Sequence, residues 1–244
     1  VEGPPCAIRG SMDDWKASVR GAWVGSVLRL GGGLGVASKL GPRPAQPLEL
    51  YEFESCPVCR KVRETMCFLD LEAVIYPCPK GGTRFRPKAV ELGGKAQFPL
   101  LIDPNTGKQL YESDDINTYL ATTYGTGRRP LMVSLGPITM LSSGLASAMR
   151  KGHGGKVRTS KLPEKRLELW SFEASPYCRL VRERLCELEL PYLLHNVAKK
   201  SPSRPAFIAR SGKMQVPWLF DPNTGTELFE SEAIIDYLDK TYSA

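Results

Sequence analysis

The sequence predicts an α/β protein made of two domains in tandem, each with the element order β-α-β-α-β-β-α. Two observations lead to this prediction. The chain repeats itself, because LELYEFESCPVC at 48–59 returns as LELWSFEASPYC at 167–178, and DPNTG at 103–107 returns at 221–225. Within each copy, alternating apolar residues and helix-like periodicity follow one another in the same order.

Each element of the first copy has a local reason. Residues 48–53 alternate as a strand, and the Cys-Pro step at 56–57 opens a helix, where Pro is favoured at the first turn. A short strand is expected at 73–76, then a helix, and then a strand in FPLLID at 98–103. DPNTG is a hairpin signal, and Ser113 is the expected N-cap of the last helix. The second copy repeats this series, with a strand at 192–196 and Ser231 as the expected N-cap.

The repeats set the expected domain boundaries. An N-terminal extension occupies 1–45, domain 1 occupies 46–125, a linker occupies 126–164 and domain 2 occupies 165–244. The extension and the linker are both expected to be partly helical. Apolar residues recur every four positions at Leu141, Leu145 and Met149, which predicts a helix over 139–150 that packs on the domains or on a partner. Gly, Pro and Ser interrupt the run 130–149, so any membrane contact is expected to be peripheral.

Composition narrows the function classes. The 244 residues are 42% hydrophobic and 24% charged with a net charge of +7, which is ordinary for a soluble globular chain. The basic residues form no dense stripe, so nucleic-acid binding is not expected. Seven irregularly spaced cysteines indicate thiols that stay mostly reduced. No second CxxC and no paired His accompany the first CxxC, so no metal site is expected.

Cys56 and Cys59 are the candidate catalytic pair. A helix N-terminus lowers the pKa of a thiol, and Arg60, Lys61 and Arg63 are expected to add positive potential near Cys56. Cys59 lies about one turn further on, where it can act as the resolving thiol. The pattern indicates a dithiol redox site, with an inert cysteine pair and metal or iron–sulfur ligation as the alternatives.

The second copy lacks this pair, because Ser175 stands at the position of Cys56. A serine cannot form a disulfide, so Cys178 is left without a partner in its own copy. Cys67 and Cys186 are expected to be small core residues. Cys6 and Cys78 have no partner that the sequence identifies.

This ordered set of residues, found twice, resembles the thioredoxin fold, and specifically glutaredoxins and the N-terminal domain of glutathione S-transferases. The tandem form, with CPKGGTRFRPK at 78–88, resembles plant and algal plastid proteins. The resemblance implies a glutathione site in which Phe98-Pro99 is cis and Glu112-Ser113 clamps the γ-glutamyl group. Its counterparts in the second copy are Val216, Pro217, Glu230 and Ser231. The basic loop of Lys80, Arg84, Arg86 and Lys88 is a candidate contact for the glycyl carboxylate or for an acidic partner, with a solvated face as the default interpretation.

The resemblance implies a glutathione-dependent thiol–disulfide oxidoreductase in the chloroplast, with glutathione as cosubstrate and protein disulfides as possible substrates. The second copy is then redox-inactive. One alternative is a non-catalytic accessory or scaffold subunit of a larger plastid assembly. Another is a glutathione-binding transferase that uses Ser175, although no all-helical transferase C-terminal domain is expected in this chain.

Overall fold

The computed structural model describes residues 12–27, 29, 31–134, 144–145 and 152–244. The predicted element order is found in both halves of the chain. The first half contains β1 (Leu48–Glu52), α2 (Pro57–Phe68), β2 (Ala73–Pro77), α3 (Phe85–Gly93), β3 (Leu100–Asp103), β4 (Lys108–Leu110) and α4 (Ser113–Thr123). The second half contains β5 (Leu167–Ser171), α7 (Pro176–Glu187), β6 (Tyr192–Asn196), α8 (Arg204–Ser211), β7 (Trp218–Asp221), β8 (Thr226–Phe229) and α9 (Ser231–Tyr242). Outside the halves lie α1 (Met12–Val27) and the short α5 (Leu131–Ser134).

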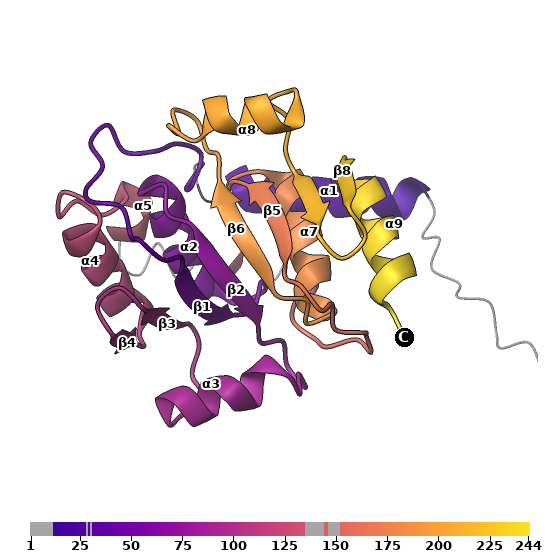
Figure 1. The fold of residues 1–244 in the computed structure, drawn as a ribbon, viewed down its shortest axis with the longest axis horizontal. Coiled ribbons are helices and arrows are strands. Elements are labelled where there is room, and N and C mark those ends of the chain that lie inside the picture. The colour runs from indigo at the N-terminus through magenta and orange to yellow at the C-terminus, as the bar shows by residue number, and fades with distance from the viewer. Residues whose placement is uncertain (1–11, 28, 30, 135–143, 146–151) are drawn as a thin grey trace, which may run out of the picture.

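The two halves form one continuous sheet of eight strands in the order β4-β3-β1-β2-β6-β5-β7-β8 (Figure 1). Each half contributes four strands in the same arrangement, with one parallel pair and two antiparallel pairs. The halves join where β2 and β6 pair antiparallel, with Ala73 opposite Leu194 and Ile75 opposite Tyr192. Neither β2 nor β6 is therefore left as an open edge of the sheet.

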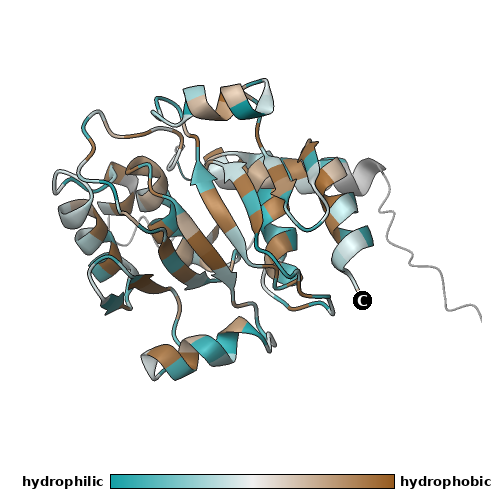
Figure 2. Ribbon diagram, viewed as in Figure 1, coloured by the Kyte–Doolittle hydropathy of each residue, from teal (hydrophilic) through white to brown (hydrophobic). Residues whose placement is uncertain are grey.

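The two faces of the sheet carry different cores. On one face a single apolar core runs across both halves, and it includes Val62 of α2, Ile116 of α4, Val181 of α7 and Ile234 of α9. On the other face each half has its own smaller core, under α3 in the first half and under α8 in the second. Figure 2 shows the apolar residues concentrated in the central strands and on the inward sides of the helices. The shared core ties the halves into one unit.

Two glycine-containing segments cross from one half to the other. In the segment 31–37, the amide of Val36 donates to the carbonyl of Lys199 in the second half, at 3.0 Å. In the segment 152–158, the carbonyl of Gly155 accepts from Lys80 in the first half, at 2.8 Å. Gly33 and Gly154 both have positive φ, 77° and 69°, and a Cβ on either would collide with Glu173 or Glu54 respectively. Glycine is needed at these two points because backbone passes directly over the glutamates.

The expected N-caps of α4 and α9 are wrong by one residue. Glu112 and Glu230 are the N-cap residues, and Ser113 and Ser231 are already the first helical residues. The reason is backbone geometry: Glu112 has a φ of 63° and Glu230 a φ of 66°, so the chain leaves helical geometry at the glutamates.

Two other expectations concern the segments outside the halves. The N-terminal extension is partly helical as predicted, because it contains α1, which packs on α7. The helix expected over 139–150 falls largely outside the described residues. Within the described part of the chain, no helix combines the length and apolar character that a membrane crossing requires.

Candidate functional site

Cys56 is the N-cap of α2, the helix that follows β1. Its backbone is extended, with φ −75° and ψ 120°, and Pro57 begins the helix immediately afterwards. The Sγ of Cys56 accepts a hydrogen bond from the backbone N–H of Cys59 at 3.3 Å. This is the interaction by which a helix N-terminus stabilises a thiolate. The sequence prediction that Cys56 and Cys59 lie together at a helix start is therefore matched by the geometry.

The pKa values of the two thiols are shifted in opposite directions. Hydrogen bonding from the Cys59 side chain lowers the pKa of Cys56 against the opposing effect of burial, and the backbone N–H groups of Cys59 and Val58 lower it further. Burial raises the pKa of Cys59 well above its ordinary value, and the hydrogen bond to Cys56 and the charges of Cys56 and Glu52 add to this. A thiolate is the reactive form of cysteine, so Cys56 is the nucleophile of the pair and Cys59 its protonated neighbour. Cys56 is only 4% exposed, which limits the reagents that can reach it.

Ser175 reproduces the geometry of Cys56 in the second half. It is the N-cap of α7 with φ −72° and ψ 120°, and its Oγ accepts from the N–H of Cys178 at 3.2 Å. Burial raises the pKa of Cys178, so the remaining thiol is both buried and protonated at neutral pH. The second half thus retains the backbone of the site without its nucleophilic sulfur.

The residues expected to bind glutathione have matching geometry in both halves. The Phe98-Pro99 and Val216-Pro217 peptide bonds are both cis, as predicted. The side chain of Gln97 donates to Glu112, and in the second half Gln215 donates to Glu230 in the same way. Both halves therefore hold a glutamate at the start of the last helix through a glutamine that lies two residues before the cis proline.

The positive charge expected around Cys56 is largely neutralised. Lys61 is buried and forms an ion pair with Asp114 of α4 at 2.7 Å. Arg60 and Arg63 turn toward the second half, where both contact Glu173. Of the three, Arg63 is the one whose charge lowers the pKa of Cys56. The expected positive potential at Cys56 is therefore confirmed for Arg63, whereas acidic partners from α4 and from the second half meet the charges of Lys61 and Arg60.

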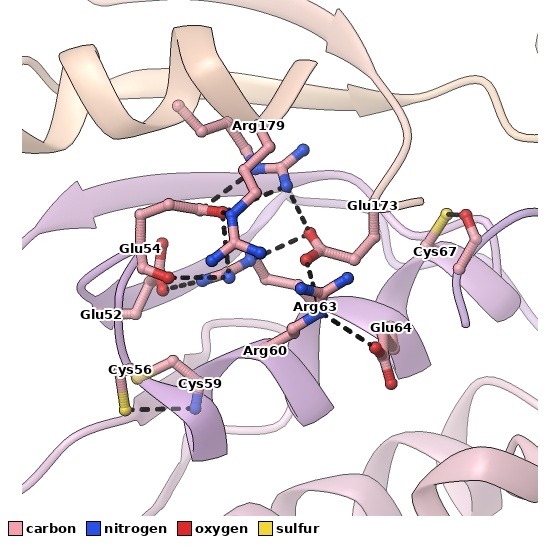
Figure 3. Close-up of polar contacts among 12 residues, drawn as sticks. Glu52, Glu54, Cys56, Cys59, Arg60, Arg63, Glu64, Cys67, Glu173 and Arg179 are labelled. Atoms are coloured by element: carbon pink, nitrogen blue, oxygen red, sulfur yellow. Dashed lines mark hydrogen bonds and ion pairs between the residues drawn. The ribbon is translucent and has the colours of Figure 1, made fainter. Parts of the chain in front are cut away.

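A buried charge cluster lies between the two halves, and Figure 3 shows most of it. Five arginines and five glutamates make up the cluster, each at most 4% exposed. They are Arg29, Glu52, Glu54, Arg60, Arg63, Glu64, Glu173, Arg179, Arg182 and Glu183. At its centre the halves exchange ion pairs: Arg63 contacts Glu173 at 3.1 Å, and Arg182 contacts Glu54 at 3.1 Å. A buried charge is tolerated only when it is paired, so these contacts hold the halves in one relative position.

The carboxylates of the charge cluster are not equivalent. Burial alone would raise the pKa of Glu173, but Arg182, Arg63 and Arg60 outweigh it and hold that pKa at about 2. Burial raises the pKa of Glu52 to about 8 although Arg63 opposes it, and the charges of Glu54, Cys56 and Glu173 add to the rise. Glu173 is therefore ionised at neutral pH, whereas Glu52 is mostly protonated there.

The other cysteines in the described part of the structure are free and buried. Cys67 and Cys186 are core residues, as predicted, and burial raises the pKa of both thiols. Cys78 is also buried, and its Sγ lies 3.4 Å from the carbonyl of Tyr76. Cys6 falls outside the described residues. Among the described residues, no group of three or more His, Cys, Asp and Glu side chains is arranged to hold a metal ion.

The basic loop divides into two parts. Arg84 is engaged by the linker and by the second half, since its guanidinium donates to the Oγ of Ser160 at 2.9 Å and to the carbonyl of Leu188 at 3.2 Å. Arg86 instead lies over the ring of Phe98, 4.6 Å from its centroid. Arg86 is therefore the member of this loop that adjoins the cis-proline turn.

The comparison with known families agrees with this geometry. The family described as "Glutathione S-transferase, N-terminal domain" matches residues 50–129 and again residues 169–244, together more than half of the chain. The chain belongs to this family. Both stretches of the glutathione S-transferase N-terminal family include a cis-proline turn and a glutamate at the start of the last helix.

Individual relatives match shorter stretches. A segment of 58 residues is 36% identical to the glutathione S-transferase-like protein tpcF of Aspergillus fumigatus, covering 24% of this chain and 26% of that protein. The chain thus matches about a quarter of the length of this curated relative. A glutathione transferase of Bombyx mori, BmGSTD1, is 30% identical over 34% of this chain and 38% of its own, with a TM-score of 0.31.

Sequence reasoning missed the charge cluster and the two glutamines. The repeat itself contained a signal for the cluster, since Glu54, Arg60, Arg63 and Glu64 all return as Glu173, Arg179, Arg182 and Glu183. Such charges on a helix face are usually solvated, and only the antiparallel β2–β6 junction brings the two sets together.

Proposed function

We propose that this protein is a glutathione-dependent thiol–disulfide oxidoreductase that uses Cys56 as nucleophile and Cys59 as resolving thiol. The observation that carries the proposal is the pairing of an N-capping thiol of lowered pKa with a second, protonated thiol one turn away. Membership of the glutathione S-transferase N-terminal family supports glutathione as the cosubstrate.

The proposed reaction begins when the Cys56 thiolate attacks a disulfide. A new bond forms between Cys56 Sγ and one sulfur of the substrate, and the other sulfur leaves as a thiolate that takes a proton from water. Cys59 then loses its proton and attacks Cys56 Sγ, which releases the second sulfur and leaves a Cys56–Cys59 disulfide. Two molecules of reduced glutathione restore the dithiol and leave as oxidised glutathione, so atoms and electrons balance.

In this proposal the two halves are tandem copies of the family's domain, of which the second is redox-inactive. Ser175 occupies the place of Cys56 with the same hydrogen bond to the backbone. A hydroxyl cannot form a disulfide with Cys178, so the second half cannot run a dithiol cycle. Its role in this proposal is to hold the first half in place through the shared sheet and the charge cluster. A plastid location belongs to the same proposal.

Reduction of a mixed disulfide of glutathione by the purified protein tests the function. We expect the wild-type protein to turn over, Cys56→Ser to fall to the uncatalysed rate, and Ser175→Ala to match the wild type. Ser175→Ala is the matched control because it changes the same N-cap position in the other half. Equal rates for wild type and Cys56→Ser would rule the function out.

A scaffold role is the second candidate, and one surface feature favours it. Helix α1 exposes Trp23, Val24 and Val27, of which Val27 is 64% exposed. Exposed apolar side chains that lie close together on one helix are a common feature of docking surfaces. Retention of a partner at fixed stoichiometry by wild type, but not by Trp23→Ser, would favour this role over catalysis.

A further inference from the structure

Two arginines of the charge cluster are only partly satisfied. Arg60 of α2 and Arg179 of α7 occupy equivalent positions in the repeat, and both are buried. Each uses its Nε for an ion pair within its own helix, with Glu64 at 3.2 Å and Glu183 at 3.1 Å respectively. Both Nη atoms of Arg60 and the Nη1 of Arg179 are shielded from solvent and lack a hydrogen-bond partner in the part of the chain that the structure describes. Unpaired donors are costly to bury, so we expect a hydrogen-bond acceptor beside them.

The two partly satisfied arginines lie near each other, at the boundary between the halves (Figure 3). The Nε of Arg60 is 3.5 Å from Glu173 of the second half, and the Nε of Arg179 is 4.0 Å from Glu54 of the first half. Both of these carboxylates contact the single guanidinium of Arg63. Burial lowers the pKa of Arg60 to about 10 although Glu173 opposes it, and the charge of Arg179 adds to the lowering. Each half therefore contributes one guanidinium with unpaired N–H donors to the same buried region.

The charges of the cluster do not balance at neutral pH. Five arginines and five glutamates of the described residues make up the cluster. Burial raises the pKa of Glu52 to about 8, so this carboxyl is mostly protonated at neutral pH. The five guanidinium groups then face only the four remaining carboxylates. An unbalanced charge is strongly disfavoured in a protein interior, and one bound monovalent anion would neutralise it.

An anion suits these donors better than a water molecule does. Each Nη atom of an arginine carries two N–H groups, whereas a water molecule accepts two hydrogen bonds, so one water cannot serve all three unpaired Nη atoms. A neutral water also leaves the repulsion between two guanidinium groups in place, and a negative ion removes it. Because the donors are shielded from solvent, the ion has to be small. A halide meets both requirements, since it accepts hydrogen bonds from any direction.

We infer that a small monovalent anion of the size of chloride binds between the guanidinium groups of Arg60 and Arg179. The unpaired Nη groups of both side chains donate to the ion, which thereby links α2 of the first half to α7 of the second. Each arginine lies one turn into its helix, since its amide donates to the carbonyl of the N-cap residue, Cys56 or Ser175. The ion therefore fixes the relative position of the two helices that begin at Cys56 and Ser175, independently of any thiol chemistry.

The dependence of stability on chloride tests the site in the intact chain. Thermal unfolding is measured at neutral pH and constant ionic strength while chloride replaces gluconate, an anion too large for a site that is closed to solvent. We expect the unfolding midpoint of the wild type to rise by roughly 3–6 °C for each tenfold increase in chloride above its dissociation constant. A wild-type midpoint that does not change with chloride would overturn the inference.

Arg60→Met is the test variant, because it removes donors of the site and leaves the carboxylates that Arg60 contacts with other partners. Glu64 keeps its ion pair with Arg29, and Glu173 keeps its contacts with two other arginines of the cluster. We expect this variant to lose most of the dependence on chloride. Arg210→Met is the matched control, since it removes the same charge from an exposed ion pair and should retain the dependence. Equal dependence in wild type and Arg60→Met would indicate a general salt effect and overturn the site.

A crystal of the wild-type protein grown in bromide gives a second readout, which is decisive even if Arg60→Met does not fold. Bromide scatters X-rays anomalously, so its position is observed directly. We expect an anomalous peak within hydrogen-bond distance of the Nη atoms of both Arg60 and Arg179. Bromide at exposed arginines alone would overturn the inference. A water molecule between the two guanidinium groups, or a direct hydrogen bond from the Nη atoms of Arg60 to Glu173, would overturn it as well.

Discussion

At the scale of single residues, the same backbone hydrogen bond has different consequences for sulfur and for oxygen. The N–H of Cys59 lowers the pKa of Cys56, and the equivalent N–H of Cys178 meets a hydroxyl. The helix N-terminus is thus preserved in both halves, and one atom decides whether it activates a nucleophile.

The first prediction concerns thiol reactivity. Brief treatment with iodoacetamide at neutral pH should label Cys56 well before Cys178 and Cys186, because only the pKa of Cys56 is lowered while burial raises the other two. Peptide mass spectrometry at successive times measures the order. Equal labelling of the three cysteines would contradict the assigned acidities, and labelling in denaturant provides the control for intrinsic reactivity.

The second prediction concerns Glu173. Glu173→Gln leaves Arg63 and Arg182 short of a buried partner and should lower the free energy of unfolding by about 3–5 kcal/mol at neutral pH. The folded pKa of Glu173, about 2, lies below its ordinary value of 4.5. Its contribution is therefore fully present above pH 4.5 and is lost as the pH falls toward 2.

Urea unfolding at several pH values measures this difference. The gap between wild type and Glu173→Gln should narrow steadily below pH 4.5, where the unfolded-state carboxyl protonates first. The control is Glu227→Gln, which removes an exposed ion pair with Arg210 and should cost at most about 1 kcal/mol. A gap that stayed constant down to pH 2 would contradict the role of the Glu173 charge.

At the scale of elements, an acidic side chain of each half forms hydrogen bonds at the start of a helix of the other half. Glu189 of the second half accepts hydrogen bonds from the backbone N–H groups of Thr83 and Arg84 at the start of α3, both at 3.2 Å. In the reciprocal position, Asp70 of the first half accepts from the hydroxyl of Ser203 at the start of α8, at 3.4 Å. The Glu189 contacts and the Ser203–Asp70 hydrogen bond add to the β2–β6 pairing that joins the halves.

The third prediction follows from the Glu189 contact. Glu189→Ala leaves two backbone donors of α3 without their acceptor and should cost about 1 kcal/mol, the usual effect of losing a helix cap. Hydrogen exchange should accelerate over Phe85–Gly93 and stay unchanged over Arg204–Ser211, so that α8 serves as the internal control. Equal acceleration in both helices would indicate global destabilisation in place of a lost cap.

The elements could be predicted from the sequence, but their assembly could not. Alternating apolar residues and turn signals depend on neighbours in the chain, so the strands and helices fell where expected. The antiparallel contact between Ile75 and Tyr192 has no local signature, because buried strands of any sheet have the same apolar composition. The charge cluster depends on that contact, and for this reason the pairing of Arg60 and Arg63 with Glu173 could not be predicted.

Backbone geometry explains the remaining errors. The left-handed φ of Glu112 and Glu230 is unusual for a residue other than glycine, so sequence patterns favoured the following serines as caps. The repeat alone marks Glu52 as unusual, because the uncharged Ser171 occupies the equivalent position at the end of the strand in the second half. Its burial in the charge cluster, where it pairs with Arg63, could be seen only in the folded structure.

At the scale of the whole molecule, the apolar core beneath α2, α4, α7 and α9 is continuous. The fourth prediction is that the intact chain unfolds in a single cooperative transition, followed by circular dichroism and Trp fluorescence together. Separate transitions by the two probes would contradict it. The tryptophans of the strands, Trp170 and Trp218, both lie in the second half, so their fluorescence would depart from the circular dichroism if the halves unfolded separately.

The fifth prediction concerns the first half alone. A fragment of residues 46–125 would expose the edge of β2 together with Glu54, Arg60 and Arg63, whose partners include residues of the second half. An open strand edge pairs readily with another chain, so we expect the fragment to dimerise or aggregate. Size-exclusion chromatography with light scattering measures this outcome. A stable, monomeric fragment would show that the junction is dispensable.

The β2–β6 junction has a consequence for how the two sites can change. In an assembly of two identical chains around a two-fold axis, every substitution appears on both sides of the axis. Here both halves belong to one chain, so equivalent positions can carry different residues. Ser175 occupies the position equivalent to Cys56, and Ser171 the position equivalent to Glu52. A glutamate in place of Ser171 would add another carboxylate to the buried charge cluster. Because one chain carries both halves, the two halves can contribute different buried charges, which a symmetric dimer could not do.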